Sequence, residues 1–174
     1  MTYQDAIAFI HNTTYRGGKD DLNNMKALLA YLDHPEKDVP MLHVAGTNGK
    51  GSVCACLQAM LRCAGYRVGL YTSPYLQRYN ERMRVDGEPI PDALLAMHMD
   101  RIAAVVWKLR AQGIWPTEFE IGTALAFVYF ASAKVDIAVI EVGLGGRLDP
   151  TNVIHPLVSV ITAIGMDHMR YLGN

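Results

Sequence analysis

A glycine-rich turn in the first third of the chain reads Gly46-Thr47-Asn48-Gly49-Lys50-Gly51-Ser52. It lies between a short apolar segment, Met41–Ala45, and a stretch with helical character at Ser52–Ala64. Glycines let backbone N–H groups approach phosphate oxygens closely, and the N-terminus of a following helix favours an anion. Lys50 adds a mobile positive charge suited to the outer phosphates, although a tight turn with an incidental lysine would have the same letters. The pattern predicts a strand, a phosphate-binding loop and a helix, in that order.

Strands that alternate with helices are predicted on either side of this turn. Val68–Thr72 is predicted as the next strand, and the largely apolar runs Val135–Val142 and Leu157–Ala163 are typical of strands buried on both faces of a parallel sheet. Helical periodicity occurs in four further segments, Thr2–Ile10, Leu22–Leu32, Asp92–Gln112 and Glu118–Ala133. A small hairpin is expected within Arg82–Ile90, turning at Asp86–Gly87. This order predicts an α/β fold with a mostly parallel sheet flanked by helices.

The composition is that of a globular protein with one domain. The 174 residues are 51% hydrophobic and carry a formal net charge of −1, which argues against a broad basic surface for nucleic acid or anionic lipid. The longest apolar stretch, Ile121–Ala133, is shorter than the ~20 residues of a membrane span, and the amino terminus lacks the pattern of a signal peptide. Three clustered cysteines, Cys54, Cys56 and Cys63, are too few for a disulfide framework, which favours a cytoplasmic protein.

A carboxylate stands near the end of the apolar run Val135–Val142. The side chain of Glu141 is expected at the carboxyl edge of the sheet, where α/β folds bind their ligands. A buried carboxylate needs a cation or hydrogen-bond donors, and Mg²⁺ takes one or two carboxylates together with phosphate oxygens and water. An ion pair with Arg147 is the alternative. The glycine cluster Gly143–Gly146 does not have the spacing of a dinucleotide fingerprint and, taken alone, is typical of a flexible connection.

Four segments, in order, resemble motifs of the folylpolyglutamate synthase and dihydrofolate synthase branch of the Mur ligase superfamily. They are residues 44–52, 70–82, 141–152 and 161–173. The first departs from the general P-loop pattern, because only two residues separate Gly46 from Gly49 and a glycine follows Lys50. Lys50-Gly51-Ser52, Ser73-Pro74 and Gly145-Gly146-Arg147 favour this branch over the Mur ligases that act on cell-wall precursors. The resemblance implies a P-loop NTPase-like Mur ligase central domain, present here in incomplete form.

This resemblance also implies an activity. Folylpolyglutamate and dihydrofolate synthases are ATP-dependent ligases, in which ATP phosphorylates a carboxylate of a folate or dihydropteroate to an acyl phosphate. The amino group of L-glutamate then attacks the acyl phosphate, and ADP and phosphate leave. The implied cofactors are therefore ATP and Mg²⁺, and the implied partners are a folate or dihydropteroate and L-glutamate, with no nucleic acid and no membrane.

The same resemblance assigns the site residues. The nucleotide-binding positions are Gly46, Thr47, Asn48, Gly49, Lys50, Gly51 and Ser52. The magnesium ligands are Ser73, Glu141 and His168, and the catalytic residues are Lys50, Glu141 and His168. Three positions resemble those that line a pterin pocket, namely Thr117, Phe119 and Asp149. Without the resemblance, His168 would be interpreted as a structural histidine, since oxygen ligands suit Mg²⁺ better, and Phe119 as core packing at the start of a helix.

Members of this family are considerably longer and have a carboxyl-terminal domain that helps to bind ATP and glutamate. We therefore expect residues 1–174 to form the amino-terminal part of the ATP-binding domain, without the glutamate-binding domain and with little turnover alone. The sheet would then expose an edge open to self-association. Three alternatives remain: a nucleotide-binding module without catalysis, a Mur ligase that acts on a cell-wall precursor, and a purely structural interaction domain.

Overall fold

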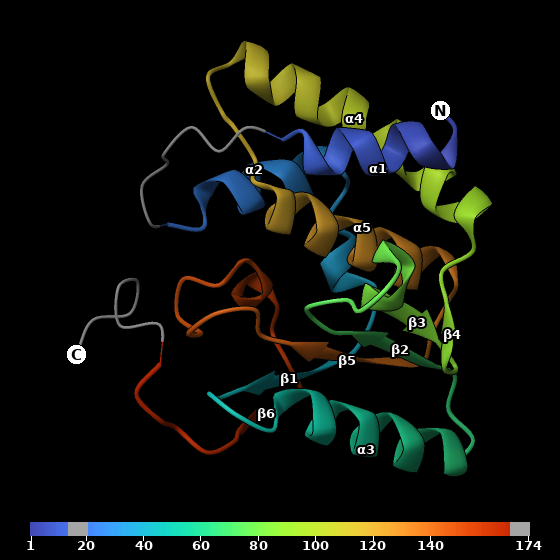
Figure 1. The fold of residues 1–174 in the computed structure, drawn as a ribbon, viewed down its shortest axis with the longest axis vertical. Helices are drawn as coiled ribbons and strands as arrows, with labels where there is room; N and C mark the ends of the chain where they lie inside the picture. The colour runs from blue at the N-terminus through green and yellow to red at the C-terminus, as the bar shows by residue number, and fades with distance from the viewer. Residues whose placement is uncertain (14–20, 168–174) are drawn as a thin grey trace.

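The computed structural model describes residues 1–13 and 21–167, and its centre is one six-stranded sheet (Figure 1). The strands lie in the order β4-β3-β2-β5-β1-β6. Their bounds are β1 Met41–Ala45, β2 Val68–Tyr71, β3 Met83–Val85, β4 Glu88–Pro89, β5 Ile137–Glu141 and β6 Val158–Ile161. Strands β2, β5, β1 and β6 run parallel to one another, whereas β3 pairs antiparallel with both of its neighbours, β2 and β4. The predicted α/β class with a mostly parallel sheet is confirmed.

The predicted hairpin is confirmed at its turn. Asp86 and Gly87 both have positive φ angles, 53° and 92°, which suit the two central residues of a tight hairpin. The backbone of Asp86 also donates to the carbonyl of Val68 at 2.9 Å, and its carboxylate accepts from the Val68 N–H at 2.9 Å. The hairpin is thereby fastened to the start of β2, which extends the parallel sheet by two antiparallel strands.

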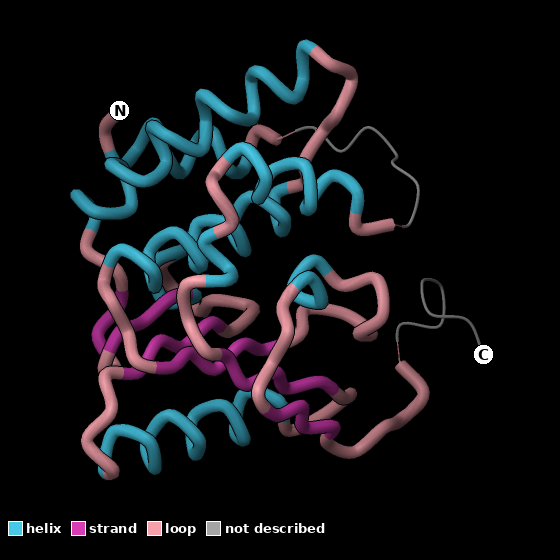
Figure 2. Tube along the Cα trace, turned by 180° about the vertical axis from the view of Figure 1, so that it is seen from behind, coloured by secondary structure: helices cyan, strands magenta, loops and turns pink. Residues whose placement is uncertain are grey.

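The helices cover the two faces of the sheet unequally (Figures 1 and 2). Their bounds are α1 Tyr3–His11, α2 Asn23–Tyr31, α3 Lys50–Cys63, α4 Asp92–Ala111 and α5 Glu118–Ser132, with short 3₁₀ turns at Pro35–Lys37, Tyr79–Arg82 and Pro150–Val153. Helix α3 lies alone on one face. Helix α5 packs on the other face, and α1, α2 and α4 form a further layer outside it.

Helix α5 is buried between the sheet and the outer helices, which explains its uniformly apolar sequence. Every residue from Glu120 to Phe130 is buried, so no polar face is needed. The helix approaches β2 closely because residue 69 is a glycine, where a Cβ would lie 2.9 Å from a ring carbon of Phe130. The apolar stretch at 121–133 is thus a core helix. Among the described residues, no helix is long and apolar enough to cross a membrane.

The core under α3 is smaller and contains one of the cysteines. Cys54 is buried with Val44, Val68 and Val139, and its burial raises the pKa of the thiol to about 12. Cys56 and Cys63 are exposed, and all three cysteines are free. The expectation of unpaired cysteines is confirmed.

The edge strand β6 departs from expectation. The run at 157–163 was predicted as a strand covered on both faces, and the strand is present between Val158 and Ile161. Its side chains are largely exposed, however, with 54% of Val158 and 67% of Ile161 accessible. Helix α3 packs over β1, β2 and β5 instead, so within the described part of the chain one side of β6 has no neighbour.

Candidate functional site

The glycine-rich loop joins the end of β1 to the start of α3. Gly46 and Gly49 have φ angles of 130° and 85°, a region that side chains other than glycine rarely adopt. A Cβ on Gly46 would also overlap the hydroxyl of Thr162. Gly49 is the N-cap of α3, so the first turn of the helix begins within the loop. The backbone is therefore held in the form that exposes N–H groups at a helix N-terminus.

Lys50 folds back over this loop. Its ammonium group donates to the carbonyl of Gly46 at 2.8 Å and to that of Thr47 at 3.2 Å. The side chain is half-buried, and its charge opposes the rise that burial causes in the pKa of both Glu141 and Cys54. The ammonium thus lies between the loop backbone and the carboxylate at the end of β5, where it can neutralise an anion bound by either.

The segment after β6 runs beside the loop. The N–H of Thr47 donates to the carbonyl of Ala163 at 3.0 Å, and the Thr47 hydroxyl donates to the carbonyl of Gly165 at 3.1 Å. The N–H of Gly165 donates back to that hydroxyl at 3.0 Å. Two motifs that lie more than 100 residues apart in the sequence are therefore adjacent. His168, which belongs to the motif at residues 161–173, lies outside the described residues.

Glu141 and Ser73 meet at the same edge of the sheet. Glu141 is the last residue of β5 and 4% exposed, and its Oε2 accepts from the Ser73 N–H at 2.9 Å. Burial raises the pKa of this carboxyl, while the Ser73 N–H and the charge of Lys50 oppose the rise. Oε1 faces the loop, 3.7 Å from where a Cβ of Gly51 would lie. The alternative pairing with Arg147 does not occur among the described ion pairs.

Two of the three predicted magnesium ligands are thus side by side. The carboxylate of Glu141 and the hydroxyl of Ser73 are hard oxygen donors, and burial raises the pKa of the carboxyl. Within the described residues, no group of three histidine, cysteine, aspartate or glutamate side chains is placed to hold a metal. The residues present therefore fit an ion that keeps phosphate oxygens and water as its other ligands, which is how proteins usually bind Mg²⁺.

Phe119 lies in the first turn of α5 and covers the end of β5. A Cβ on Gly143 would overlap the Phe119 ring, so the glycine permits the contact. The ring also packs against Tyr71, with 6.1 Å between the centroids and a tilt of 48°. Phe119 is half-buried against the main core, so the core-packing interpretation holds for one part of the ring. Thr117 caps this helix through a hydrogen bond from the Glu120 N–H at 3.2 Å.

Asp149, the third predicted pocket residue, is held by a buried network. Its Oδ1 accepts from the backbone N–H and the hydroxyl of Thr151, and its Oδ2 accepts from the Leu144 N–H at 2.8 Å. The Thr151 hydroxyl lies 2.8 Å from Nε2 of His43 on β1. Because the carboxylate only accepts, the threonine hydroxyl donates to it, and His43 must then donate from Nε2. Burial lowers the pKa of His43, which keeps the imidazole neutral.

Sequence reasoning missed two members of this network. Thr151 had a signal, since Asp149-Pro150-Thr151 is a turn sequence in which the aspartate accepts from the residue two positions later. No such signal pointed to His43, because a histidine in a buried strand is equally compatible with a structural and with a functional role. The structure shows His43 buried and hydrogen-bonded.

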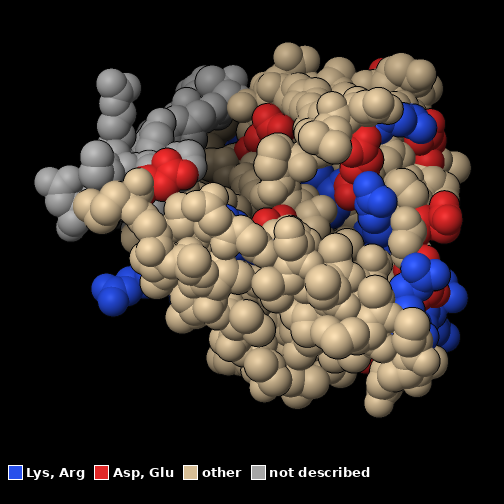
Figure 3. All heavy atoms as spheres, turned by 60° about the horizontal axis from the view of Figure 1, so that its bottom comes forward, with Lys and Arg blue, Asp and Glu red and all other residues tan. Residues whose placement is uncertain are grey.

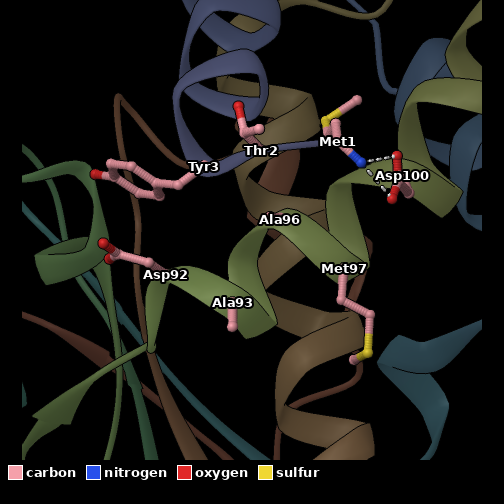
Figure 4. Close-up of a pocket in the computed structure, with 8 residues that line it drawn as sticks. All are labelled: Met1, Thr2, Tyr3, Asp92, Ala93, Ala96, Met97 and Asp100. Carbon is pink, nitrogen blue, oxygen red and sulfur yellow. Dashed lines mark hydrogen bonds and ion pairs between the residues drawn. The ribbon is translucent and has the colours of Figure 1, made fainter.

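A separate hollow lies between α1 and α4, away from these residues (Figure 4). It is lined by Met1, Thr2, Tyr3, Asp92, Ala93, Ala96, Met97 and Asp100. The amino group of Met1 contacts both carboxylate oxygens of Asp100 at 2.7 Å, and Figure 4 shows this ion pair at one side of the hollow. None of the sequence-predicted site residues lines it, so it plays no part in the site described above.

Figure 3 brings α3 forward and shows a largely uncharged face, in keeping with the absence of charged residues from Gly51 to Leu61. Behind this face the surface is hollowed, with acidic and basic side chains inside the hollow (Figure 3).

A parallel sheet with a glycine-rich loop after β1 and a carboxylate at the end of β5 defines a P-loop-like α/β protein.

The chain belongs to the Mur ligase family, because the Mur ligase middle domain matches residues 44–174. The dihydrofolate synthase/folylpolyglutamate synthase of Bacillus subtilis is 51% identical over 99% of this chain. The folylpolyglutamate synthase of Lacticaseibacillus casei is 43% identical over 100% of it. These alignments cover 40% and 41% of the relatives, so the chain spans about 40% of their length.

Solved structures agree with this assignment. The fold superposes on the structure of an FPGS–AMPPCP–folate complex with a TM-score of 0.95 at 44% sequence identity. The match covers 100% of this chain and 43% of that chain. The predicted P-loop-like Mur ligase fold, present in incomplete form, is therefore confirmed.

Proposed function

We propose that this chain is the ATP-binding part of a ligase that joins L-glutamate to a carboxylate of a folate or dihydropteroate. The observation that carries the proposal is the meeting of three features at one sheet edge: the glycine-rich loop, Lys50 and the Ser73–Glu141 pair. The relatives that match almost the whole chain are folylpolyglutamate and dihydrofolate synthases, and a matching structure contains AMPPCP and folate.

The loop would bind and orient the triphosphate of ATP. The N–H groups of Gly49, Gly51 and Ser52 begin α3, where the helix dipole favours an anion. Lys50 would move from the loop carbonyls to the outer phosphates, since its present partners are two backbone carbonyls, of Gly46 and Thr47, that an anion can replace. Phosphoryl transfer depends mainly on positioning and on neutralising charge, and this loop supplies both.

Ser73 and Glu141 would hold a magnesium ion together with the phosphates. The bound ion supplies charge neutralisation for phosphates and acceptor carboxylate. The chain's part is to present the Glu141 carboxylate, which the Ser73 N–H fixes from one side. His168 stays in the proposal as the third ligand and as a catalytic residue, on the strength of the resemblance alone.

Thr117, Phe119 and Asp149 would form the pterin pocket. Phe119 offers a ring face for stacking, and the hydrogen bonds to Asp149 fix the direction of its remaining lone pairs. Ring N–H groups of a pterin are donors, so a rigid carboxylate acceptor suits them.

We also propose that residues 1–174 form the amino-terminal part of an ATP-binding domain, which would turn over little without a glutamate-binding domain. The exposed side of β6 favours self-association, which the sedimentation coefficient at increasing protein concentration would reveal. The three free thiols suit a reducing, cytoplasmic compartment.

The acceptor class is tested by calorimetric titration in the presence of magnesium and AMPPCP. Dihydropteroate and folate are expected to bind, whereas a muramoyl-peptide nucleotide is expected not to. Binding of the muramoyl nucleotide alone would support a cell-wall Mur ligase. Nucleotide binding without affinity for any acceptor would leave a nucleotide-binding module and would overturn the proposed ligase.

A further inference from the structure

The last residue of α1 contacts two segments that lie far apart in the sequence. Nδ1 of His11 lies 3.3 Å from Oε1 of Glu118, in the first turn of α5. Nε2 of the same ring lies 3.4 Å from the hydroxyl of Tyr75, in the segment that follows β2. Both ring nitrogens are therefore directed at side chains outside α1, and we call these two contacts the His11 bridge.

The two segments that the bridge joins contain predicted site residues. Tyr75 comes two positions after Ser73, which is predicted to bind magnesium. Glu118 stands between Thr117 and Phe119, which are predicted to line the acceptor pocket. In the proposed reaction, the carboxylate of the acceptor must reach the metal side while its ring stays in the pocket. The separation of the two segments therefore decides whether the reacting groups can meet.

A histidine at the end of a helix has an ordinary explanation, because the helix dipole favours a basic group in the last turn. That explanation does not require the ring to be held by side chains from elsewhere. The ring of His11 packs edge-on against Tyr79, with 5.8 Å between the centroids and 81° between the planes. It is also tilted against the ring of Tyr75, at 6.4 Å. These aromatic contacts fix the directions in which the two nitrogens point.

The segment after β2 is held more firmly at its other end. Asn80 is 3% exposed, and its Oδ1 accepts from the hydroxyl of Tyr3 at 2.7 Å. The His11 bridge is weaker, since both of its distances are longer than those of a strong hydrogen bond. Its ion pair is also partly exposed, with 38% of the His11 and 41% of the Glu118 side chain accessible. Tyr75 is therefore at the less firmly held end.

The strength of the bridge depends on the charge of the imidazole. A neutral ring has one donor and one acceptor, so Nδ1–H donates to Glu118 and the Tyr75 hydroxyl donates to Nε2. In the imidazolium both nitrogens donate, and the contact with Glu118 becomes an ion pair. Histidine is the side chain whose charge ordinarily changes between pH 5 and 8. Protonation therefore strengthens the bridge, by the modest amount that an exposed ion pair supplies.

Other charged groups near the ring oppose this effect only in part. Arg82 stacks on Tyr79, 5.3 Å from its ring centre. Arg110 of α4 donates to the hydroxyl of Thr13 at 3.4 Å. Both guanidinium groups contact neighbours of the imidazole, whereas the Glu118 carboxylate contacts the ring directly, so the attraction prevails. Burial raises the pKa of the Tyr79 phenol, which therefore stays neutral in this range.

We propose that His11 is a positioning residue, which sets the distance between the metal side of the site and the acceptor pocket. This inference rests on the proposed function. Acceptor affinity then depends on the fraction of molecules in which the bridge is formed. Nucleotide affinity depends on the glycine-rich loop, to which the bridge has no contact among the described residues, and it stays unchanged.

Two substitutions of His11 test this role through folate affinity, measured calorimetrically with magnesium and AMPPCP at about pH 7.5 and about pH 6. His11→Phe keeps a ring and removes both polar contacts, so it should weaken folate binding about threefold to tenfold at either pH. His11→Gln keeps one donor and one acceptor, as in the neutral imidazole, and should match wild type at the higher pH. At the lower pH, wild type should bind folate about twofold to fourfold more tightly than His11→Gln.

His155→Phe is the matched control, because His155 is exposed and outside the bridge. It should behave as wild type at both pH values. Glu118→Gln should remove the advantage that wild type gains at the lower pH, since the ion pair can no longer form. AMPPCP affinity, measured without folate, should be the same in all variants.

Three results would overturn the inference. They are wild-type folate affinity in His11→Phe, weakened AMPPCP binding in that variant, which would indicate a general effect on folding, and a ratio of wild type to His11→Gln that does not change with pH. If wild-type protein binds the nucleotide but not folate, the proposed function fails as well. If folate binds and only the variants disagree, the proposed function stands.

Discussion

The two halves of the site are built in opposite ways. At the glycine-rich loop, consecutive residues present backbone N–H groups, and the only long side chain, Lys50, lies on exchangeable contacts. At the acceptor side, Phe119 and Asp149 come from distant segments, and side chains help to fix them, the Tyr71 ring for Phe119 and the Thr151 hydroxyl for Asp149. The nucleotide half should therefore be sensitive to backbone conformation, and the acceptor half to single polar atoms.

The largest effect is expected where the backbone of the loop is disturbed. Gly46→Ala would place a Cβ against Thr162 at a φ of 130°, which combines strain of about 1–3 kcal/mol with steric overlap. The free energy of unfolding in urea should fall by about 3 kcal/mol, and nucleotide binding should be lost. Gly146→Ala is the control, since no atom lies within 4 Å of its added Cβ, and it should change stability by less than about 0.5 kcal/mol. Equal stability of the two variants would show that steric fit does not fix the loop.

A smaller effect is expected where one polar atom is removed from the acceptor half. Thr151→Val keeps the shape of the side chain but leaves the buried Nε2–H of His43 without an acceptor. The loss should be about 1–3 kcal/mol of unfolding free energy, with nucleotide affinity unchanged. Thr151→Ser, which retains the hydroxyl, should recover most of the stability. Loss of nucleotide affinity in the valine variant would contradict the separation of the two halves.

The smallest effect on stability, and the one that depends on pH, is expected at Glu141. Burial raises the pKa of its carboxyl in the folded protein. The stability that the protonated carboxyl contributes is therefore fully present below the unfolded pKa of about 4, and it is lost as pH rises through the folded pKa. Without magnesium, Glu141→Gln should therefore be more stable than wild type at pH 8. The difference in thermal midpoint should shrink toward pH 4. A variant less stable than wild type at pH 8 would show that the carboxylate is already compensated by its neighbours.

Local features of the fold followed from the sequence. The bounds predicted for β1 agree with the structure, and the hairpin turns at Asp86–Gly87, because glycine and aspartate accept the positive φ angles that a tight turn needs. Thr2 and Asp5 form a capping box, which depends on two residues three positions apart. Such features depend on a few neighbouring residues, so the sequence pattern contains them in full.

Long-range features did not follow. The apolar run at 157–163 could not predict that Val158 is exposed, because hydrophobicity indicates a strand but not whether a helix covers it. The His43–Thr151–Asp149 network joins residues more than 100 positions apart, and the stacking of Arg82 on Tyr75 depends on the path of a loop. The resemblance supplied the pocket positions, and only the structure shows which neighbours hold them.

Magnesium-dependent ATP binding is the most direct test of the central claim, which places the nucleotide at the glycine-rich loop. Calorimetry would compare the wild-type chain with Lys50→Ala and with Lys108→Ala, a control on the outer helix α4. Wild type and the control should bind alike, and Lys50→Ala should lose about tenfold or more in affinity, as expected for a lost charge-assisted contact. Undiminished binding by folded Lys50→Ala protein would contradict the account, because the nucleotide would then lie elsewhere.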